Sequence, residues 1–570
     1  SERVPAGTTW SWPARRRTAR RRMVVAMGLP WGDAPKTAVG VLVLASAAAV
    51  GHAEEGEELE HVSKANLGIS VMLLGSIAFM MSLFYLTNLK DPELRKYSWK
   101  VISATISIFS AVLLFQAFNG LLEHFFLTGA SKEFELLVAC CHFMAWFAIL
   151  QMALAVISGA VGGGKERAEE DMWAMEVNLQ CFATLLGHIT GFAAINTFAV
   201  LQQVVPRNGV SLFLCGPFAW TCVWMLGRFT DGVRDAVALG DDGKVDECEE
   251  KWDEATEETE DDVVGLCVSF VTVQWLRFCI SGQLPNEEGE EPESMLSSHS
   301  NGEVVALFMA GIIVEFVHAY KTLYFQPWSS QRFTPQMRNV TAMIFAWCFF
   351  FSSDWWISAT FFTEEHGMIK QVVLAMFVTF WSLALIFVLD KVEEAYSEDS
   401  KMESAIRSMI LALSILIGFG WERAFDTAVA DTTEQVEGVP HAFTKMVLAV
   451  LLTGIVIPAW KMHVLPTIMA LEAAEEGHGQ HHDEEHAEEA RDSLPALQQP
   501  LLDADGLLLS RKPSEVEKRY QDLLLQVDDL KVKAAEADEL RRRNADLEGT
   551  VLGISSELGE LQKLATLLSS

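Results

Sequence analysis

The sequence predicts an all-α fold, a polytopic transmembrane helical bundle of about eleven spans followed by a C-terminal coiled coil. Hydrophobic residues make up 50% of the 570 residues, and the mean hydropathy is +0.22. They are concentrated in long runs with few charges, whereas the end of the chain repeats apolar residues at steps of three and four. The first pattern is typical of helices that cross a bilayer, and the second is typical of a coiled coil.

The first 53 residues are expected to contain no membrane span. The apolar run at 37–51 has 15 residues, fewer than the roughly twenty that a spanning helix needs. Basic residues precede this run, and small residues follow it just before two glutamates, which is the layout of a secretory signal peptide with its cleavage site. We therefore interpret 1–53 as upstream sequence and a signal peptide. A short helix that is retained as an anchor is the alternative.

Eleven later runs are long enough to cross a bilayer, because roughly twenty apolar residues in a helix span its hydrocarbon core. Several of these runs are longer, which predicts tilted or protruding helices. The runs lie at 66–88, 100–127, 133–158, 173–203, 210–228, 262–282, 303–326, 338–362, 367–390, 404–430 and 440–464.

The positions of lysine and arginine predict the orientation of the spans. Sixteen of these residues lie on one side, and the opposite loops hold only Lys132 and Arg207. Because basic residues accumulate on the cytosolic side, the C-terminus is expected in the cytosol and the mature N-terminus outside it. The signal peptide predicts the same placement. The expected location is the plasma membrane or another membrane of the secretory pathway, and a plastid membrane reached through that pathway is the alternative.

The two halves of the apolar region are similar in sequence. A shift of 236 positions aligns Gly75 with Gly311, and a shift of 229 aligns Gly191 with Gly420. With the span count, this similarity predicts two parallel five-helix repeats, an organisation found in transporters. Chance similarity between phenylalanine-rich helices is the alternative. The expected order is a first repeat at 66–228, an acidic cytosolic loop at 229–261, a linking helix at 262–282 and a second repeat at 303–464.

Polar residues inside the predicted spans are the candidate functional residues, because a charge in hydrocarbon is costly unless it faces the bundle interior or a wet cavity. They recur in the non-cytosolic half of the spans that run outward. Several are four residues apart and therefore share a helix face. We predict a transport pathway lined by Asn119, Glu123, His188, Asn196, Asp354, Glu422, Arg423 and Asp426.

Structural roles compete with this hypothesis. Glu123 and Asp426 lie close enough to helix ends to reach the headgroup region, where charge is common. Arg423 can neutralise Glu422 or Asp354 in an ion pair that holds helices together. Asp354 and Glu422 lie deepest in their spans and are therefore the strongest candidates.

The chain after the last span has two predicted parts. Residues 471–513 are expected to form an acidic, solvated linker, and the alternative is that its histidines bind zinc, copper or nickel or respond to pH. Residues 514–570 follow a pattern that favours a parallel two-stranded coiled coil. It predicts a homodimer or a coiled-coil partner, and a single amphipathic helix docked on another protein is the alternative. The linker histidines are His478, His481, His482 and His486.

The leading hypothesis for function is a multi-pass channel or secondary transporter, surrounded by lipid, with a cation or protons as its ligand. A membrane scaffold or receptor that recruits partners through its coiled coil is the second hypothesis, and a membrane-embedded enzyme is the third. The formal net charge of −33 argues against nucleic acid as a partner, because a phosphate backbone binds basic surfaces. No motif in the sequence predicts a cofactor.

Overall fold

The computed structural model describes residues 64–88, 92–161, 169–240, 245–324, 332–362, 367–395, 400–433 and 440–472. Secondary structure within these ranges is helical, without a strand. The predicted signal peptide and coiled coil, and nearly all of the linker, lie outside them. Eleven of the described helices are long and apolar enough to cross a membrane, which confirms the predicted all-helical class and the number of candidate spans.

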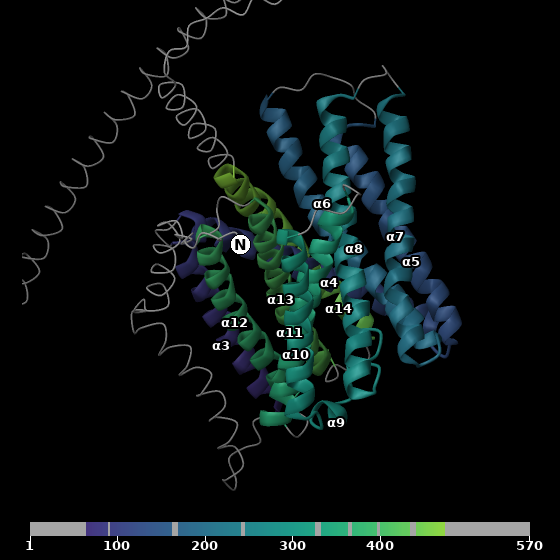
Figure 1. Ribbon diagram of the computed structural model, residues 1–570, viewed down its shortest axis with the longest axis vertical. Helices are drawn as coiled ribbons and strands as arrows, with labels where there is room; N and C mark the ends of the chain where they lie inside the picture. Colours follow the sequence, from purple (N-terminus) through teal and green to yellow (C-terminus); the bar gives the residue numbers. More distant parts are fainter. Residues whose placement is uncertain are drawn as a thin grey trace, which may run out of the picture. The chain divides into compact units, whose positions relative to one another are not determined.

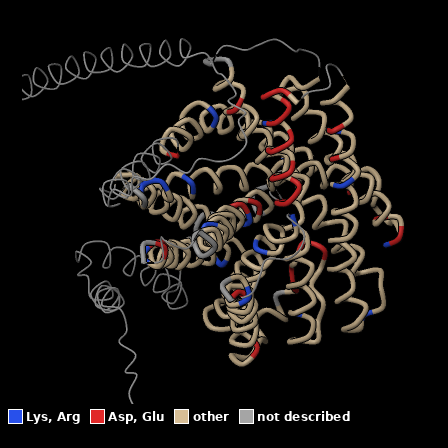
Figure 2. The backbone as a smooth tube through the Cα atoms, turned by 45° about the horizontal axis from the view of Figure 1, so that its top comes forward, with Lys and Arg blue, Asp and Glu red and all other residues tan. Residues whose placement is uncertain are grey.

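The helices are long rods packed side by side (Figure 1), and long stretches of them carry no charged residue (Figure 2). α4 continues into a π-helical turn at Glu123–Leu127, and α14 continues into one at Trp460–Val464. The helices are α3 (Lys64–Thr87), α4 (Pro92–Leu122), α5 (Lys132–Ser158), α6 (Glu169–Val204), α7 (Gly209–Ala238), α8 (Glu247–Ser281), α9 (Glu293–Leu296), α10 (Asn301–Tyr324), α11 (Phe333–Phe361), α12 (Gly367–Ala395), α13 (Ser400–Thr433) and α14 (His441–Ala459).

Five helices form an inner ring. α4, α6, α8, α11 and α13 contact one another in that order, and α13 contacts α4 again, which closes the ring. In each of these helices at least 61% of the most apolar stretch is buried, against at most 39% in the other six candidate spans. The outer helices α3, α5, α7, α10, α12 and α14 pack around the ring and leave large apolar side chains exposed. Such extensive apolar surface is typical of contact with lipid.

The helices of the ring run in the same direction. Asp261 on α8 bonds to Gln336 near the start of α11, and Arg277, further along α8, stacks on Phe351, further along α11. Contacts between α11 and α13, and between α6 and α8, advance along both helices in the same way. The ring therefore has an N-terminal end, where its helices begin, and a C-terminal end, where they finish.

The segment 229–261, expected to be an acidic loop, is mostly helical. α7 continues to Ala238, and α8 begins at Glu247 with a capping box between Asp246 and Glu249. Arg234 on α7 pairs with Glu260 on α8 at 3.0 Å, and each side chain is only 3% exposed. Both helices therefore continue beyond the apolar runs that hydropathy detects, and this ion pair holds their polar extensions together.

The expected duplication stays a prediction. α8, expected to be a linking helix, is itself a member of the ring. Gly75 and Gly311, which the sequence aligns, have different neighbours: Gly75 lies against Val372 and Trp421 on α12 and α13, and Gly311 lies against Cys348 on α11. The unit that recurs along the described chain is a pair of one outer helix and the inner helix that follows it, as in α5 with α6 and α12 with α13.

Gly418 allows α13 to pack directly on α4. A Cβ atom at this position would lie 1.9 Å from Cγ2 of Ile108 and 2.9 Å from the carbonyl oxygen of Thr105. We expect Gly418→Ala to lower the free energy of unfolding by about 1–3 kcal/mol through overpacking, measured by denaturant unfolding in detergent micelles. Gly454→Ala is the control, because Gly454 on α14 has no neighbour within 4 Å. Equal stability of the two variants would contradict the close helix contact.

Candidate functional site

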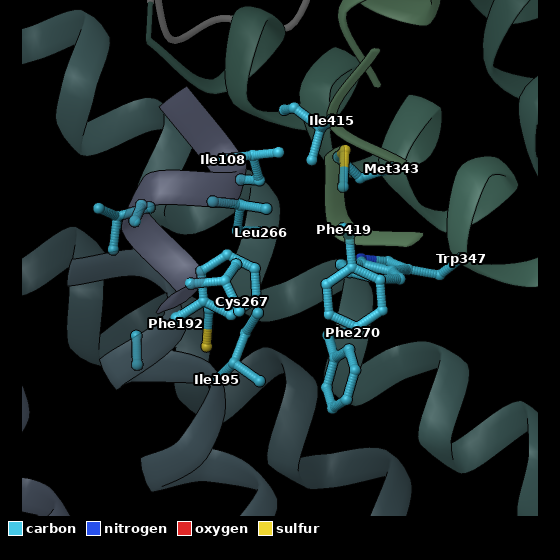
Figure 3. Close-up of a cluster of buried hydrophobic side chains, with 14 of the residues drawn as sticks. Ile108, Phe192, Ile195, Leu266, Cys267, Phe270, Met343, Trp347, Ile415 and Phe419 are labelled. Atoms are coloured by element: carbon cyan, nitrogen blue, oxygen red, sulfur yellow. The ribbon is translucent and has the colours of Figure 1, made fainter. Parts of the chain in front are cut away.

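An aromatic layer crosses the centre of the ring. We give this name to Phe192, Phe270, Trp347 and Phe419, which come from α6, α8, α11 and α13 and point toward one another (Figure 3). The rings of Trp347 and Phe419 lie 4.9 Å apart and are perpendicular, and Phe192 stacks on Phe419 at 6.2 Å. Each side chain is at most 6% exposed. The layer therefore separates the interior of the ring into an N-terminal half and a C-terminal half.

Three of the predicted residues meet in the C-terminal half. Asp354 on α11 is 3% exposed, and Glu422 and Arg423 on α13 are 0% and 8% exposed. Arg423 interacts electrostatically with Asp354 and Glu422, and its Nη2 atom donates a hydrogen bond to Oε1 of Glu290 at 3.0 Å. Neither carboxyl oxygen of Glu422 has a hydrogen-bond partner. The charged groups predicted to lie deepest are thus close together and buried.

The chain between α8 and α10 folds back into the C-terminal half, and we call residues 282–300 the plug loop. Arg277 on α8, which is 1% exposed, donates hydrogen bonds to the carbonyl oxygen of Gly289 at 2.8 Å and to Glu291 at 2.6 Å. Gly289 has a φ of 81°, and a Cβ atom there would lie 2.9 Å from Phe270. Glycine is therefore required at this position, and the plug loop reaches the aromatic layer.

The plug loop contains two carboxyl groups with shifted pKa values. Desolvation, together with the nearby carboxylate of Glu290, raises the pKa of Glu288 to about 7. Because the Glu288 side chain remains exposed, its carboxylate neighbours are the firmer cause. Burial alone would raise the pKa of Glu291, but a hydrogen bond from His299 and the charge of Arg277 lower it. The loop thus combines a carboxyl group whose pKa is raised with one whose pKa is lowered.

The other predicted residues of this half surround the cluster. Asn119 donates a hydrogen bond to Glu123 at 2.7 Å, as expected for a shared helix face, and Glu123 is exposed. Asp426 is half-buried and pairs with Lys445 on α14. Asn196 is half-buried on α6, one turn beyond the aromatic layer. Glu123 and Asp426 therefore lie at the rim of the cluster.

His188 lies on the other side of the aromatic layer, away from these residues. It is 3% exposed, its Nδ1 atom has no hydrogen-bond partner, and it lines a small cavity together with Asp262. At the N-terminal end, Arg332 pairs with Glu260 at 3.0 Å and with Asp231 at 2.9 Å. Burial opposes the charge of Arg332, but these ion pairs raise its pKa further above the usual range. Both halves of the ring therefore contain buried charge.

The sequence did not identify Glu290, Glu291 or Lys445 as partners of the buried charges. Glu290 and Glu291 belong to a loop, and the way a loop folds back leaves no periodic signal in the sequence. Lys445 lies near the start of the last span, where a basic residue looks like an ordinary interface residue. Arg277 interrupts the apolar run of α8 and can be noticed in the sequence as an arginine at membrane depth, but its partners Gly289 and Glu291 cannot.

Comparison with protein-family models, curated proteins and solved structures finds no match to this chain. The fold supports only a broad class of protein: a polytopic helical bundle compatible with an integral membrane protein in a lipid bilayer. Within the described ranges, no group of three or more histidine, cysteine or acidic side chains is arranged to hold a metal ion. The predicted histidine cluster at 478–486 lies outside those ranges.

Proposed function

We propose that the protein is a channel or secondary transporter that moves protons or another small cation through the centre of the inner ring. The observation that carries this proposal is the meeting of Asp354, Glu422 and Arg423 inside the ring. Close packing alone can hold membrane helices together, whereas charged groups at membrane depth are costly and typically line a pathway.

Glu422 is the group best suited to bind the transported species. An ion pair explains Arg423, whose side chain bonds to Glu290, but it does not explain a buried carboxyl group with two unpaired oxygens. A buried polar group without a partner is destabilising by about 1–3 kcal/mol. A proton or small cation held at Glu422 would supply the missing interaction, and Asp354 would be the next binding site along the pathway.

In the proposed orientation the C-terminal end of the ring faces away from the cytosol, as the lysine and arginine positions predict. The plug loop would then cover the entrance on that side, and the cavity beside His188 would face the cytosol. Residues 514–570 would join two copies of the chain through a coiled coil. The pathway would remain inside each copy, because the ring closes within one chain.

Transport is tested by reconstituting the full chain in proteoliposomes and measuring proton and alkali-cation flux. We expect Glu422→Gln and Asp354→Asn to reduce flux by about tenfold or more, the equivalent of roughly 1.4 kcal/mol of lost stabilisation. Glu133→Gln is the matched control, because Glu133 is an exposed carboxylate at the start of α5. Wild-type flux in both buried variants would remove the proposed pathway.

A membrane scaffold is the second candidate function, and the aromatic layer favours it. A ring closed at its centre by four buried aromatic side chains resembles a packed core as much as a gated path. The scaffold hypothesis predicts that deletion of 514–570 abolishes the binding of partner proteins in a pull-down and that the intact chain shows no flux. Flux that survives this deletion would favour transport.

A further inference from the structure

A second polar site lies in the N-terminal half of the ring, separated from the charged cluster by the aromatic layer. It is a cavity of about 20 Å³ lined by residues of α6, α8, α11 and α13, which are four of the five ring helices. A cavity above about 10–15 Å³ has room for a water molecule when two to four polar groups face it. His188, Asp262, Asn339 and Ser408 are the polar residues that line it.

Three of these side chains form a directed chain of hydrogen bonds. Oγ of Ser408 donates to Oδ1 of Asn339 at 3.2 Å, and Nδ2 of Asn339 donates to Oδ1 of Asp262 at 3.3 Å. Both ends of the Asn339 amide are therefore used, and its orientation favours an acceptor at Asp262. The second carboxyl oxygen of Asp262 is left available for another hydrogen bond.

His188 lines the same cavity from α6, and one of its two ring nitrogens lacks a hydrogen-bond partner. Its side chain is 3% exposed, and its Nδ1 atom is buried without a hydrogen bond. A buried nitrogen in this position is unfavourable unless water or another group satisfies it. A water molecule in the cavity can bond to the imidazole on one side and to Asp262 on the other, which satisfies both groups.

The chemistry of the cavity favours a proton over a metal cation. A hard cation such as Ca²⁺ requires six to eight oxygen ligands, and Mg²⁺ requires an octahedral set. Here the Asn339 oxygen already accepts from Ser408, and a ring nitrogen replaces one of the oxygens. An imidazole, a water molecule and a carboxylate are instead the groups that pass a proton along hydrogen bonds.

We infer that His188 and Asp262 form a proton-binding station, bridged by water, on the N-terminal side of the aromatic layer. This inference rests on the proposed function and names its transported species as the proton. Binding adds one proton to the group of imidazole, water and carboxylate, and no other bond changes. Glu258 and Asp261 on α8 interact electrostatically with Asp262, and Arg338 on α11 interacts with Asp261. These charged neighbours influence the proton affinity of the station.

Infrared difference spectra between acidic and alkaline pH test the station on the full chain in nanodiscs, without relying on flux. We expect a carboxyl band that disappears in Asp262→Asn, shifts in His188→Gln and is unchanged in His142→Gln. His142 is the matched control, because it lies on the outer helix α5 and already accepts a hydrogen bond from Trp146. A pH-dependent band that neither cavity variant affects would overturn the inference.

Proton flux in proteoliposomes separates this inference from the proposed function. We expect Asp262→Asn and His188→Gln to reduce proton flux by about tenfold or more, with His142→Gln unchanged. Should a cavity variant fail to fold, Gly265→Ala replaces it, because a Cβ atom there lies 3.2 Å from Cβ of Asn339 and narrows the cavity while both titratable groups remain.

Flux lost in Glu422→Gln but retained in every cavity variant would refute the station and leave the pathway intact. Absence of flux in the wild type, with the band lost in Asp262→Asn, would refute transport and leave the station.

Discussion

Replacing Arg277 by methionine is expected to lower the free energy of unfolding by about 3–5 kcal/mol, the usual effect of removing one partner of a buried ion pair. Arg277 and Glu291 are 1% and 2% exposed and lie 2.6 Å apart. The guanidinium also stacks 3.9 Å from the ring centre of Phe351 and holds the backbone of Gly289. Methionine preserves apolar contact with the aromatic ring but leaves the buried Glu291 with only His299 as a partner. Denaturant unfolding in detergent micelles measures the loss.

Two variants show whether the pair itself is responsible. Arg277→Met combined with Glu291→Gln should recover part of the stability, because it removes the uncompensated charge. Arg207→Met is the matched control, since Arg207 is exposed, and it should change stability by less than about 0.5 kcal/mol. If Arg277→Met and Arg207→Met were equally stable, the plug loop would not depend on the buried ion pair.

The class of fold could be predicted from the sequence because membrane insertion depends on local composition. A run of roughly twenty apolar residues identifies a spanning helix without reference to its neighbours. This is why the eleven predicted runs correspond to eleven candidate spans in the structure. The deep positions of Asp354 and Glu422 could be read in the same way, as interruptions of apolar runs on α11 and α13.

The division into ring and outer helices could not be predicted, because it depends on which faces fit each other. Gly418 permits contact between α13 and α4, which are far apart in the sequence, and hydropathy gives no information about such fits. Among the candidate spans in the described part of the chain, the most apolar one lies on the outer helix α12, whereas the ring helix α11 has one of the lowest hydropathies. The five ring helices are thus all less apolar than the outer helix α12.

The candidate site was only partly predictable for a related reason. A helix fixes which of its residues share a face, so the bond between Asn119 and Glu123 follows from their spacing. The partner of Arg423 instead comes from the plug loop, where Glu290 accepts its hydrogen bond. Loops have no periodicity that fixes the direction of their side chains. Sequence reasoning therefore offered Glu422 or Asp354 as partners and could not foresee Glu290.

The aromatic layer should act as the barrier of the proposed pathway, and its removal is expected to increase transport. Trp347 is completely buried, donates a hydrogen bond to Ser269 at 3.2 Å and packs against Phe419. We expect Trp347→Ala to lower stability by about 3–5 kcal/mol, as in other large-to-small core changes. The space left by the missing indole ring would let water connect the two halves of the ring of helices. Proton flux should therefore rise by about tenfold or more, since hydrophobic constrictions restrict flow by excluding water.

Trp381→Ala is the matched control for this prediction, because Trp381 on the outer helix α12 is 50% exposed. Its loss should leave flux unchanged, since lipid replaces the ring without opening the interior. Phe419→Leu is a milder change in the same layer and should raise flux less than Trp347→Ala while retaining more stability. If Trp347→Ala folds and its flux equals or falls below that of the wild type, the aromatic layer cannot be the barrier. The pathway would then have to avoid the centre of the ring, which would separate the charged cluster of Glu422 from the cavity of His188.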